Sequence, residues 1–445
     1  MMIWIEFVIL LACILIGARI GGIALGAVAG IGLVIFVFIF GLPPGGPPET
    51  VIGMILAVIT ALATMEAAGG LDYLVSLAER IMRKNPQYIT FVAPVVTYVL
   101  VFASGTTHVI YAVLPVIAEV SRKADIRPER PLSISVIAGF QGVIASPISA
   151  ATVAMIGLLT ARGVSLPLLL AITIPSTFLA VLIGALSVAW RGNKLSDDPE
   201  YQSRLASGAV KSPEALPELQ GKGLLNARGS TMLFLAGIVA VVLIGMFPKL
   251  RPVYEVVAES GVETDQVSMG RAIIIVMIAI AGLIMILFKA SPEATVKGTM
   301  MRSGLVAIIS IIGVSWLGSS FFEANRPAIV GGISDLIRHY PWTFAAGLFV
   351  LSAGLFSAAA TVVILVPVGL ALELPARFLI AFYPAANSVF FLPTYGTVLA
   401  AVSFDQTGTT RIGKYLLNHS FMLPGLVTVV SAVIIALLLG TVFPT

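Results

Sequence analysis

The chain has 445 residues, of which 58% are hydrophobic and only 11% charged, and its net charge is +4. Its mean hydropathy of +1.04 is far above that of a soluble domain. These values exclude a soluble globular class and predict an all-α polytopic membrane protein. The basic residues lie in short loops between apolar segments, where they set membrane topology, so no nucleic-acid partner is expected.

The single cysteine, Cys13, lies in an apolar run, which excludes an intrachain disulfide and a thiolate metal cluster. The N-terminal apolar run has no basic region before it and no cleavage motif of small residues. We therefore expect a retained membrane span at this end of the sequence and not a removed signal peptide.

Apolar segments of about 20 residues predict the membrane spans in chain order. The first half, 1–190, has predicted spans at 3–18, 21–41 and 50–68, then an amphipathic surface stretch at 71–84. A hairpin over 88–120 follows, with two short arms and a polar tip at Ser104–His108. It is expected to enter and leave the membrane on one side. A span at 131–160, broken at Pro147, and a span at 164–189 complete the unit.

A polar segment at 191–229, rich in Ser, Pro, Lys and Glu, is predicted to be a cytoplasmic linker. The second half, 230–445, then repeats the order of the first. Its predicted elements are spans at 230–248, 270–289 and 303–318, a surface stretch at 328–340, a hairpin at 342–373, a broken helix at 376–404, and a last span at 418–443. Scaffold helices are expected within 3–68 and 230–318.

Five crossings in each half predict that the second copy is inverted relative to the first. If the linker is cytoplasmic, 19 of the 26 Lys and Arg residues fall on the inside. This distribution agrees with the positive-inside rule and places both termini in the periplasm. Charge does not decide whether the hairpins re-enter, because two full crossings would leave the flanking loops on the same sides.

Hydroxyl and proline clusters interrupt corresponding apolar segments of the two halves, as they do at the midplane sites of secondary transporters. Helices that start at such breaks point free N–H groups and a positive dipole end at a bound anion. Two tips from two repeats suit a substrate with two negative ends, such as a dicarboxylate. The alternative is that the hydroxyls bond between helices and the prolines only kink them. The predicted substrate-binding residues are Ser104, Gly105, Thr106, Thr107, His108, Pro147, Ser149, Ser357, Thr361, Asn387, Pro393 and Thr394.

Two ionisable residues have alternative interpretations. His108, within the first tip, could carry a proton or pair with a carboxylate, or it could be a neutral imidazole bonded to a neighbouring helix. Glu66 ends a span and is expected to face water near the inner surface, and a role as a cation ligand is the alternative. No HExxH or GxSxG motif and no pair of buried carboxylates is present in the sequence, so an enzyme is not expected.

Several motifs resemble the Dcu family of anaerobic C4-dicarboxylate transporters of bacteria. They include Ala145-Ser-Pro-Ile-Ser-Ala150, Leu392-Pro-Thr-Tyr395 and Asp405-Gln-Thr-Gly-Thr-Thr-Arg-Ile-Gly-Lys414. Further matching segments are Gly17–Gly26, Ala68–Asp72 and Leu195–Pro199, so the resemblance extends over nearly the whole chain. Thr107-His-Val-Ile-Tyr111 and Gly41-Leu-Pro-Pro-Gly-Gly-Pro-Pro48 are closer to the fumarate–succinate antiporter branch.

The resemblance implies exchange of fumarate, malate and aspartate for succinate across the inner membrane. It also implies two re-entrant hairpins, an elevator motion, a homodimer formed through the scaffold, and in some members a second role as co-sensor of a membrane sensor kinase. Family members carry Gln and Lys near the second tip, where this chain has Ala358 and Val363. No cofactor is expected apart from a coupling ion, Na⁺ or H⁺, and a coupled carrier of another small anion is the alternative.

Overall fold

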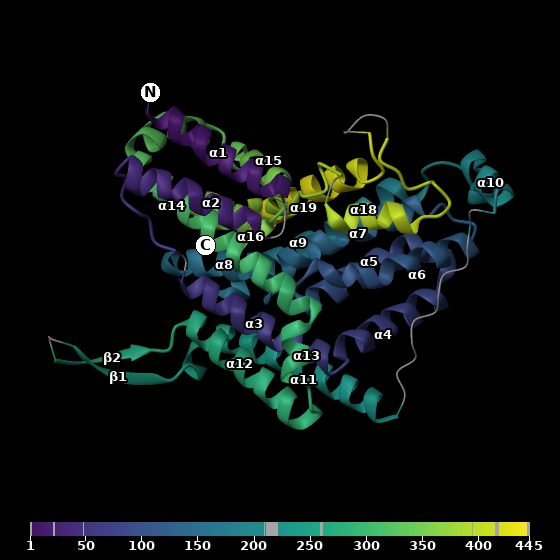
Figure 1. Ribbon diagram of the computed structural model, residues 1–445, viewed down its shortest axis with the longest axis horizontal. Coiled ribbons are helices and arrows are strands. Elements are labelled where there is room, and N and C mark those ends of the chain that lie inside the picture. The colour runs from purple at the N-terminus through teal and green to yellow at the C-terminus, as the bar shows by residue number, and fades with distance from the viewer. Residues whose placement is uncertain are drawn as a thin grey trace.

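The computed structural model describes residues 2–20, 23–47, 49–208, 210, 221–258, 261–393, 395–413 and 418–442. Helices dominate this part of the chain (Figure 1). The first half contains α1 (Met2–Ile20), α2 (Ala24–Val34) with a π-helical continuation (Ile35–Ile39), α3 (Glu49–Ala67), α4 (Gly70–Lys84), α5 (Ile89–Ser104), α6 (Ile110–Lys123), α7 (Glu129–Ala145), α8 (Ala150–Leu159) and α9 (Leu166–Ala189). Short 3₁₀ turns lie at Pro86–Tyr88, Thr107–Val109 and Thr160–Arg162.

The connecting segment and the second half are also mainly helical. They contain a 3₁₀ turn (Leu195–Asp197), α10 (Pro199–Ala206), α11 (Gly221–Met246), a 3₁₀ turn (Pro248–Leu250), α12 (Met269–Phe288), α13 (Pro292–Lys297), α14 (Thr299–His339), α15 (Trp342–Leu355), α16 (Ala358–Ala371), α17 (Ala376–Phe382), η7 (Tyr383–Asn387), α18 (Gly396–Phe404) and α19 (Met422–Val442).

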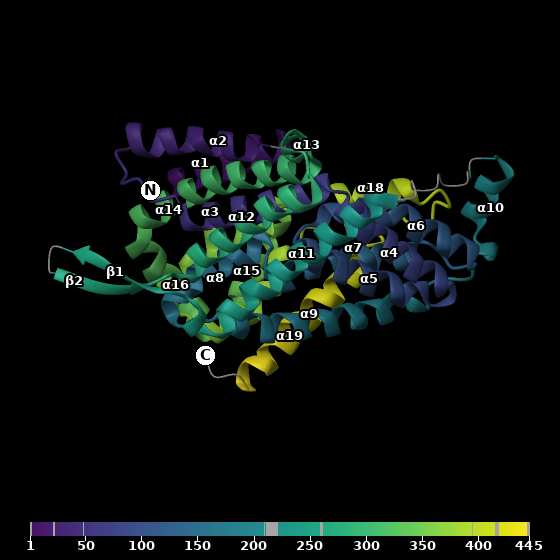
Figure 2. The ribbon, with the colours of Figure 1, turned by 90° about the horizontal axis from the view of Figure 1, so that it is seen from below.

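Three features differ from the elements expected from the sequence. Helix α11 begins at Gly221, so the last part of the expected linker belongs to this helix. Helix α14 continues for 41 residues through Pro327, where a span and a separate surface stretch were expected. An antiparallel hairpin of β1 (Val253–Ala258) and β2 (Gly261–Gln266) projects from the helices (Figure 2).

Six helical segments of the described chain are long and apolar enough to cross a membrane: Pro86–Ser104, Glu129–Arg162, Leu166–Ala189, Gly223–Gly245, Met269–Phe288 and Met422–Val442. Helices α3 and α4 pass the same test together, bent by 73°. These segments confirm the polytopic all-α class, whereas the expected ten spans stay a prediction. The first hairpin arm is long enough to cross, so its length does not argue for re-entry, but α15 and α16 have 14 residues each.

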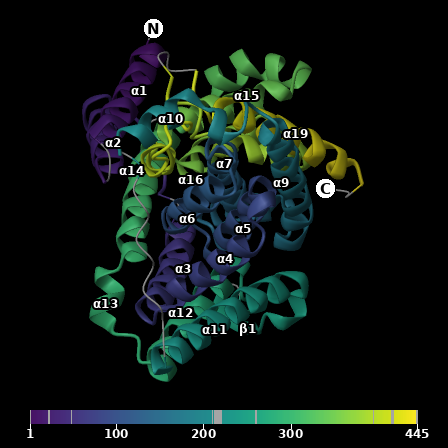
Figure 3. The same cartoon turned by 90° about the vertical axis from the view of Figure 1, so that its right-hand side faces the viewer.

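The helices pack in two sets. In one, α2 packs on α1 and α14, and α3 packs on α12 and α14. In the other, α5 packs on α7, α9 on α7 and α19, and α16 on α8. Figure 3 shows α5 and α7 near the centre, α1 and α2 at the upper left, α15 at the top, and α11 and α12 at the bottom. One arm of the first hairpin and the helix α7 therefore lie in the middle of the molecule.

Small residues let helices of the first set approach closely. A Cβ atom on Gly313 of α14 would lie 2.0 Å from the carbonyl oxygen of Gly26 on α2. Only glycine leaves room for this backbone contact. Close helix contact through small residues is a main source of attraction between helices in lipid, where apolar burial contributes little.

Candidate substrate site

The first tip is a tight turn between α5 and α6. Gly105 has φ of 68° and ends α5, a backbone conformation that residues with a Cβ atom rarely adopt. The hydroxyl of Ser104 donates to the carbonyl oxygens of Val101 (3.4 Å) and Thr106 (3.3 Å). Ser104 is therefore buried and used within the turn. Thr107 is also buried, and the side chain of His108 lies outside the described residues.

The break in the first half separates α7 from α8 at 146–149. Ser149 has extended backbone angles, and its hydroxyl accepts a hydrogen bond from the Thr152 amide (3.1 Å), which caps α8. The hydroxyl of Ser146 donates to the Phe102 carbonyl oxygen on the first hairpin arm (2.7 Å). Pro147 lies buried between these two serines. The break is thus held by serine hydroxyls on both sides of the proline.

The second tip has the same cap chemistry as the first break. Phe356 ends α15 with φ of 53°, and the hydroxyl of Ser357 then accepts from the Ala360 amide (3.2 Å), which caps α16. Thr361 is fully buried and donates its hydroxyl to the Ser357 carbonyl oxygen (2.8 Å). The sequence therefore places a serine-capped helix N-terminus in each half, α8 in one and α16 in the other.

The break in the second half extends from η7 to the start of α18. Asn387 is 4% exposed, and its side-chain amide donates to the Phe140 carbonyl oxygen on α7 (2.6 Å). This residue therefore joins the two broken helices. Pro393 is buried, and Thr394 lies outside the described residues.

Hydrogen bonds join the interrupted segments to one another. The Tyr383 hydroxyl of η7 lies 3.0 Å from the Thr152 hydroxyl of α8. Ser352 of α15 accepts from the Ser388 amide (3.0 Å) and donates to the Ala385 carbonyl oxygen (3.3 Å). Because α16 also packs on α8, both hairpins and both broken helices meet in one region.

Sequence reasoning missed several residues of this region, above all Tyr383 and Tyr395. Tyr383 is the largest fully buried side chain of the described chain. Tyr395 packs edge-on against Phe140 (5.5 Å between ring centres) and stacks on Phe356 of the second tip (6.4 Å). Both tyrosines lie next to the prolines of the second break. The signal that could have identified them is a polar aromatic side chain within an apolar run.

The serine caps leave free amides at two helix N-termini. In α8, the first helical hydrogen bond runs from the Val153 amide to the Ser149 carbonyl oxygen (2.9 Å). In α16, it runs from the Thr361 amide to the Ser357 carbonyl oxygen (3.1 Å). The serine hydroxyl accepts from the third amide of each helix, so the first two amides have no acceptor within the helix. Together with the positive dipole ends, they can bind a carboxylate. The serines thus act on an anion through the helices that they position.

A cavity of about 110 Å³ lies beside the first tip. Ser104, Gly105 and Thr106 line it from the tip, and apolar residues of α3 and α14 line the opposite side. This small space lies between the central set of helices and the surrounding set. It brings three of the predicted residues to one cavity.

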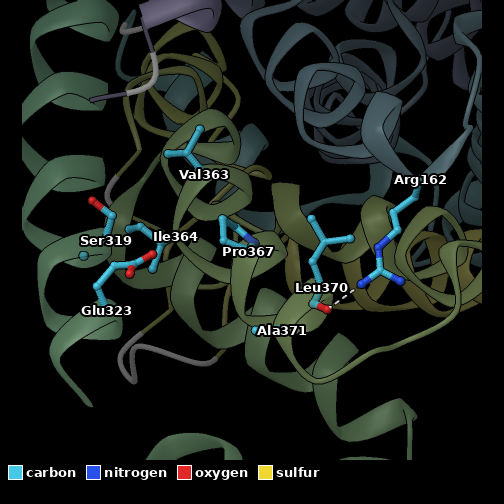
Figure 4. A pocket seen from close by; sticks show the side chains of 9 residues that line it. Arg162, Ser319, Glu323, Val363, Ile364, Pro367, Leu370 and Ala371 are labelled. Atoms are coloured by element: carbon cyan, nitrogen blue, oxygen red, sulfur yellow. Dashed lines mark hydrogen bonds between the residues drawn. The ribbon is translucent and has the colours of Figure 1, made fainter. Parts of the chain in front are cut away.

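A larger cavity, of about 350 Å³, lies between α14 and α16 (Figure 4). Ser319 and Glu323 line one side, and apolar residues of α16 line the middle. Arg162 lines the other side and donates to the Leu370 carbonyl oxygen (2.9 Å). None of the predicted substrate residues lines this cavity.

Two acidic residues have structural roles. Glu66 accepts hydrogen bonds from the Thr299 amide (3.3 Å) and the Met300 amide (3.0 Å), so it caps α14 from another helix. Asp405 is 3% exposed and accepts from the Thr407 amide (2.9 Å) and the Thr410 amide (2.6 Å). A carboxylate that accepts several amide hydrogen bonds fixes the local backbone. Asp405 therefore organises the loop before α19.

The connecting segment is fixed to the first half by ion pairs. Asp198 caps α10 through the Tyr201 amide (3.1 Å) and contacts the Arg127 guanidinium at 2.5 Å. Arg127 also pairs with Glu129 at the start of α7 (3.2 Å). The first part of the expected linker is thus attached to the broken helix of the first half.

Comparisons with known proteins agree with this architecture. The family described as anaerobic C4-dicarboxylate membrane transporter matches residues 2–444. The anaerobic C4-dicarboxylate transporter DcuB of Escherichia coli O6:H1 is 40% identical over 442 residues, covering 96% of both chains. The C4-dicarboxylate transporter DcuA of Escherichia coli K12 is also 40% identical, over 444 residues and 99% of both chains.

The crystal structure of the YdaH transporter of Alcanivorax borkumensis has a similar fold. The TM-score is 0.60 at 16% identity, over 89% of this chain and 86% of that chain. Identity at this level concerns the fold alone. The family match over nearly the whole length, together with the two relatives at 40% identity, is decisive: the chain belongs to the anaerobic C4-dicarboxylate membrane transporter family, whose members are transporters and not enzymes.

Proposed function

We propose that this protein exchanges C4-dicarboxylates, taking up fumarate, malate or aspartate and releasing succinate across the bacterial inner membrane. The observation that carries the proposal is the pair of serine-capped helix N-termini, α8 and α16, which come from the two halves and pack together. Two positive helix ends suit a ligand with two carboxylates. The names of the 40% identical relatives support the same substrate class.

The mechanism we propose is alternating access by an elevator motion of two inverted repeats. The hairpins and broken helices would move as one body, because hydrogen bonds join them. Ser146 bonds to Phe102 of the first hairpin, and Ser388 bonds to Ser352 of the second. The bond from Asn387 to Phe140 joins the two broken helices to each other. The helices α1–α3 and α11–α14 would stay fixed and form the homodimer. The charge distribution of the sequence supports periplasmic termini.

The experiment is counterflow into proteoliposomes loaded with unlabelled succinate, following entry of labelled fumarate with and without a sodium gradient. Uptake that requires internal succinate and does not depend on sodium would support exchange. Uptake that requires a sodium gradient, or a proton gradient in a parallel set, would support a coupled importer. Absence of uptake from correctly folded protein would refute dicarboxylate transport and favour another small anion.

Butyrate inside the liposomes is the matched control, since it has the carbon chain of succinate but only one carboxylate. A site built on two helix ends should give little exchange with butyrate. Equal exchange with butyrate and succinate would contradict the role of two carboxylates.

A further inference from the structure

Helix α18 begins differently from α8 and α16. Its N-cap residue, Tyr395, makes no side-chain hydrogen bond to the helix. The first backbone bonds come from Val398 and Leu399 to the Tyr395 carbonyl oxygen, at 3.0 and 3.1 Å. The amides of Gly396 and Thr397 therefore precede the first helical hydrogen bond.

Thr397 gives an independent indication of a ligand at this helix end. It lies in the first turn of α18, is 1% exposed, and its hydroxyl has no hydrogen-bond partner among the described residues. A buried hydroxyl without a partner is unfavourable, and buried polar groups in native proteins nearly always have one. A bound acceptor at the start of α18 would provide it.

Tyr395 joins this helix end to the second hairpin tip. Its ring stacks on Phe356 of the second tip with an angle of 22° between the planes, and packs edge-on against Phe140 of α7. Contacts with these two segments fix the position of the phenol ring.

We propose that Tyr395 and Thr397, with the first amides of α18, form a subsite for one carboxylate of the substrate. The serine-capped ends of α8 and α16 would then share the other carboxylate, in place of one carboxylate at each of these two ends. The Tyr395 ring, which stacks on Phe356 of the second tip, sets the length of diacid that reaches from this subsite to those ends. This inference rests on the proposed function and adds the residues that determine chain-length specificity.

The test measures inhibition of labelled fumarate counterflow by malonate, succinate and glutarate, which differ by one methylene each. Tyr395→Phe and Thr397→Val remove one hydroxyl each, and each should raise the half-inhibitory concentration of succinate about tenfold. Tyr395→Leu removes the ring and should reduce the preference for succinate over glutarate at least about threefold.

Two matched controls remove buried hydroxyls outside the subsite. The Tyr98 hydroxyl bonds to Thr177 (2.8 Å), and the Thr428 hydroxyl donates to the Pro424 carbonyl oxygen (2.6 Å). Tyr98→Phe and Thr428→Val should keep the inhibition profile of the wild-type protein. Thermal unfolding of each purified variant, with and without succinate, gives a second measurement that does not need transport.

The outcomes separate the two proposals. If the wild-type protein shows no fumarate uptake and no inhibition by any diacid, the proposed function itself is wrong. If the wild-type protein transports fumarate but Tyr395→Phe and Thr397→Val keep its succinate inhibition, the subsite is wrong. For a variant that folds but does not transport, loss of stabilisation by succinate supports the subsite, and stabilisation equal to that of the wild-type protein overturns it.

Discussion

Replacing Ser149 with alanine should affect transport far more than the same change at another helix cap. Ser149 and Ser165 both cap a helix, α8 and α9, by accepting a hydrogen bond from the amide three residues on, at 3.1 and 3.3 Å. Loss of a serine cap costs about 1 kcal/mol. The two positions differ in burial, because Ser149 is fully buried whereas Ser165 is exposed.

Burial raises the cost at Ser149. At Ser165, water can replace the lost acceptor, so we expect a cost of about 0.5–1 kcal/mol. At Ser149 the Thr152 amide stays buried without its cap, and the hydrogen bond between the two hydroxyls (3.0 Å) is also lost. An unsatisfied buried group costs about 1–3 kcal/mol, so Ser149→Ala should cost about 2–4 kcal/mol. The first turn of α8 should then lose its position beside the substrate.

The assay compares thermal unfolding in detergent with the concentration dependence of fumarate counterflow for both variants. Ser165→Ala should unfold a little earlier and keep the apparent fumarate affinity. Ser149→Ala should unfold earlier still and bind fumarate at least about tenfold more weakly. Equal affinities in the two variants would refute the placement of the substrate at the capped end of α8.

Three further changes test other parts of the structure. Asp198→Ala leaves the Arg127 charge with one fewer partner and should lower stability by about 2–3 kcal/mol; unchanged unfolding would mean that α10 is not held by this pair. Gly313→Ala places a Cβ atom 2.0 Å from the Gly26 carbonyl oxygen and should cost about 1–3 kcal/mol, measured by thermal unfolding, unless α2 and α14 do not touch in the membrane. Burial lowers the pKa of His419, in the loop before α19, below its ordinary value of about 6.5. The folded protein should therefore keep its full stability above pH of about 6.5 and lose stability as the pH falls below that value. His419→Gln should reduce this pH dependence of thermal unfolding, and an unchanged pH dependence would contradict the assignment.

The features that could be predicted from the sequence are those that depend on local chemistry. Apolar length and low charge gave the membrane class, because a helix that crosses lipid must be apolar over about 20 residues. The caps of α8 and α16 could also be expected locally, since Ser149 and Ser357 stand directly before apolar helical runs. The same holds for the break around Pro147, because proline cannot continue the backbone hydrogen bonding of a helix interior.

Which of these local features meet depends on contacts between segments that are far apart in the sequence. The expected donation of Asn387 to substrate stays a prediction. Its side-chain amide also bonds to a carbonyl oxygen 247 residues away in sequence, and no local pattern specifies such a pair. The contact of Tyr395 with Phe140 of α7 likewise depends on how the two halves pack. Helix α14 continues past its apolar part because a helix satisfies its own backbone in lipid and in water alike, so polarity does not mark its end. The sequence therefore located the polar breaks, and long-range packing determined which of their side chains face one another.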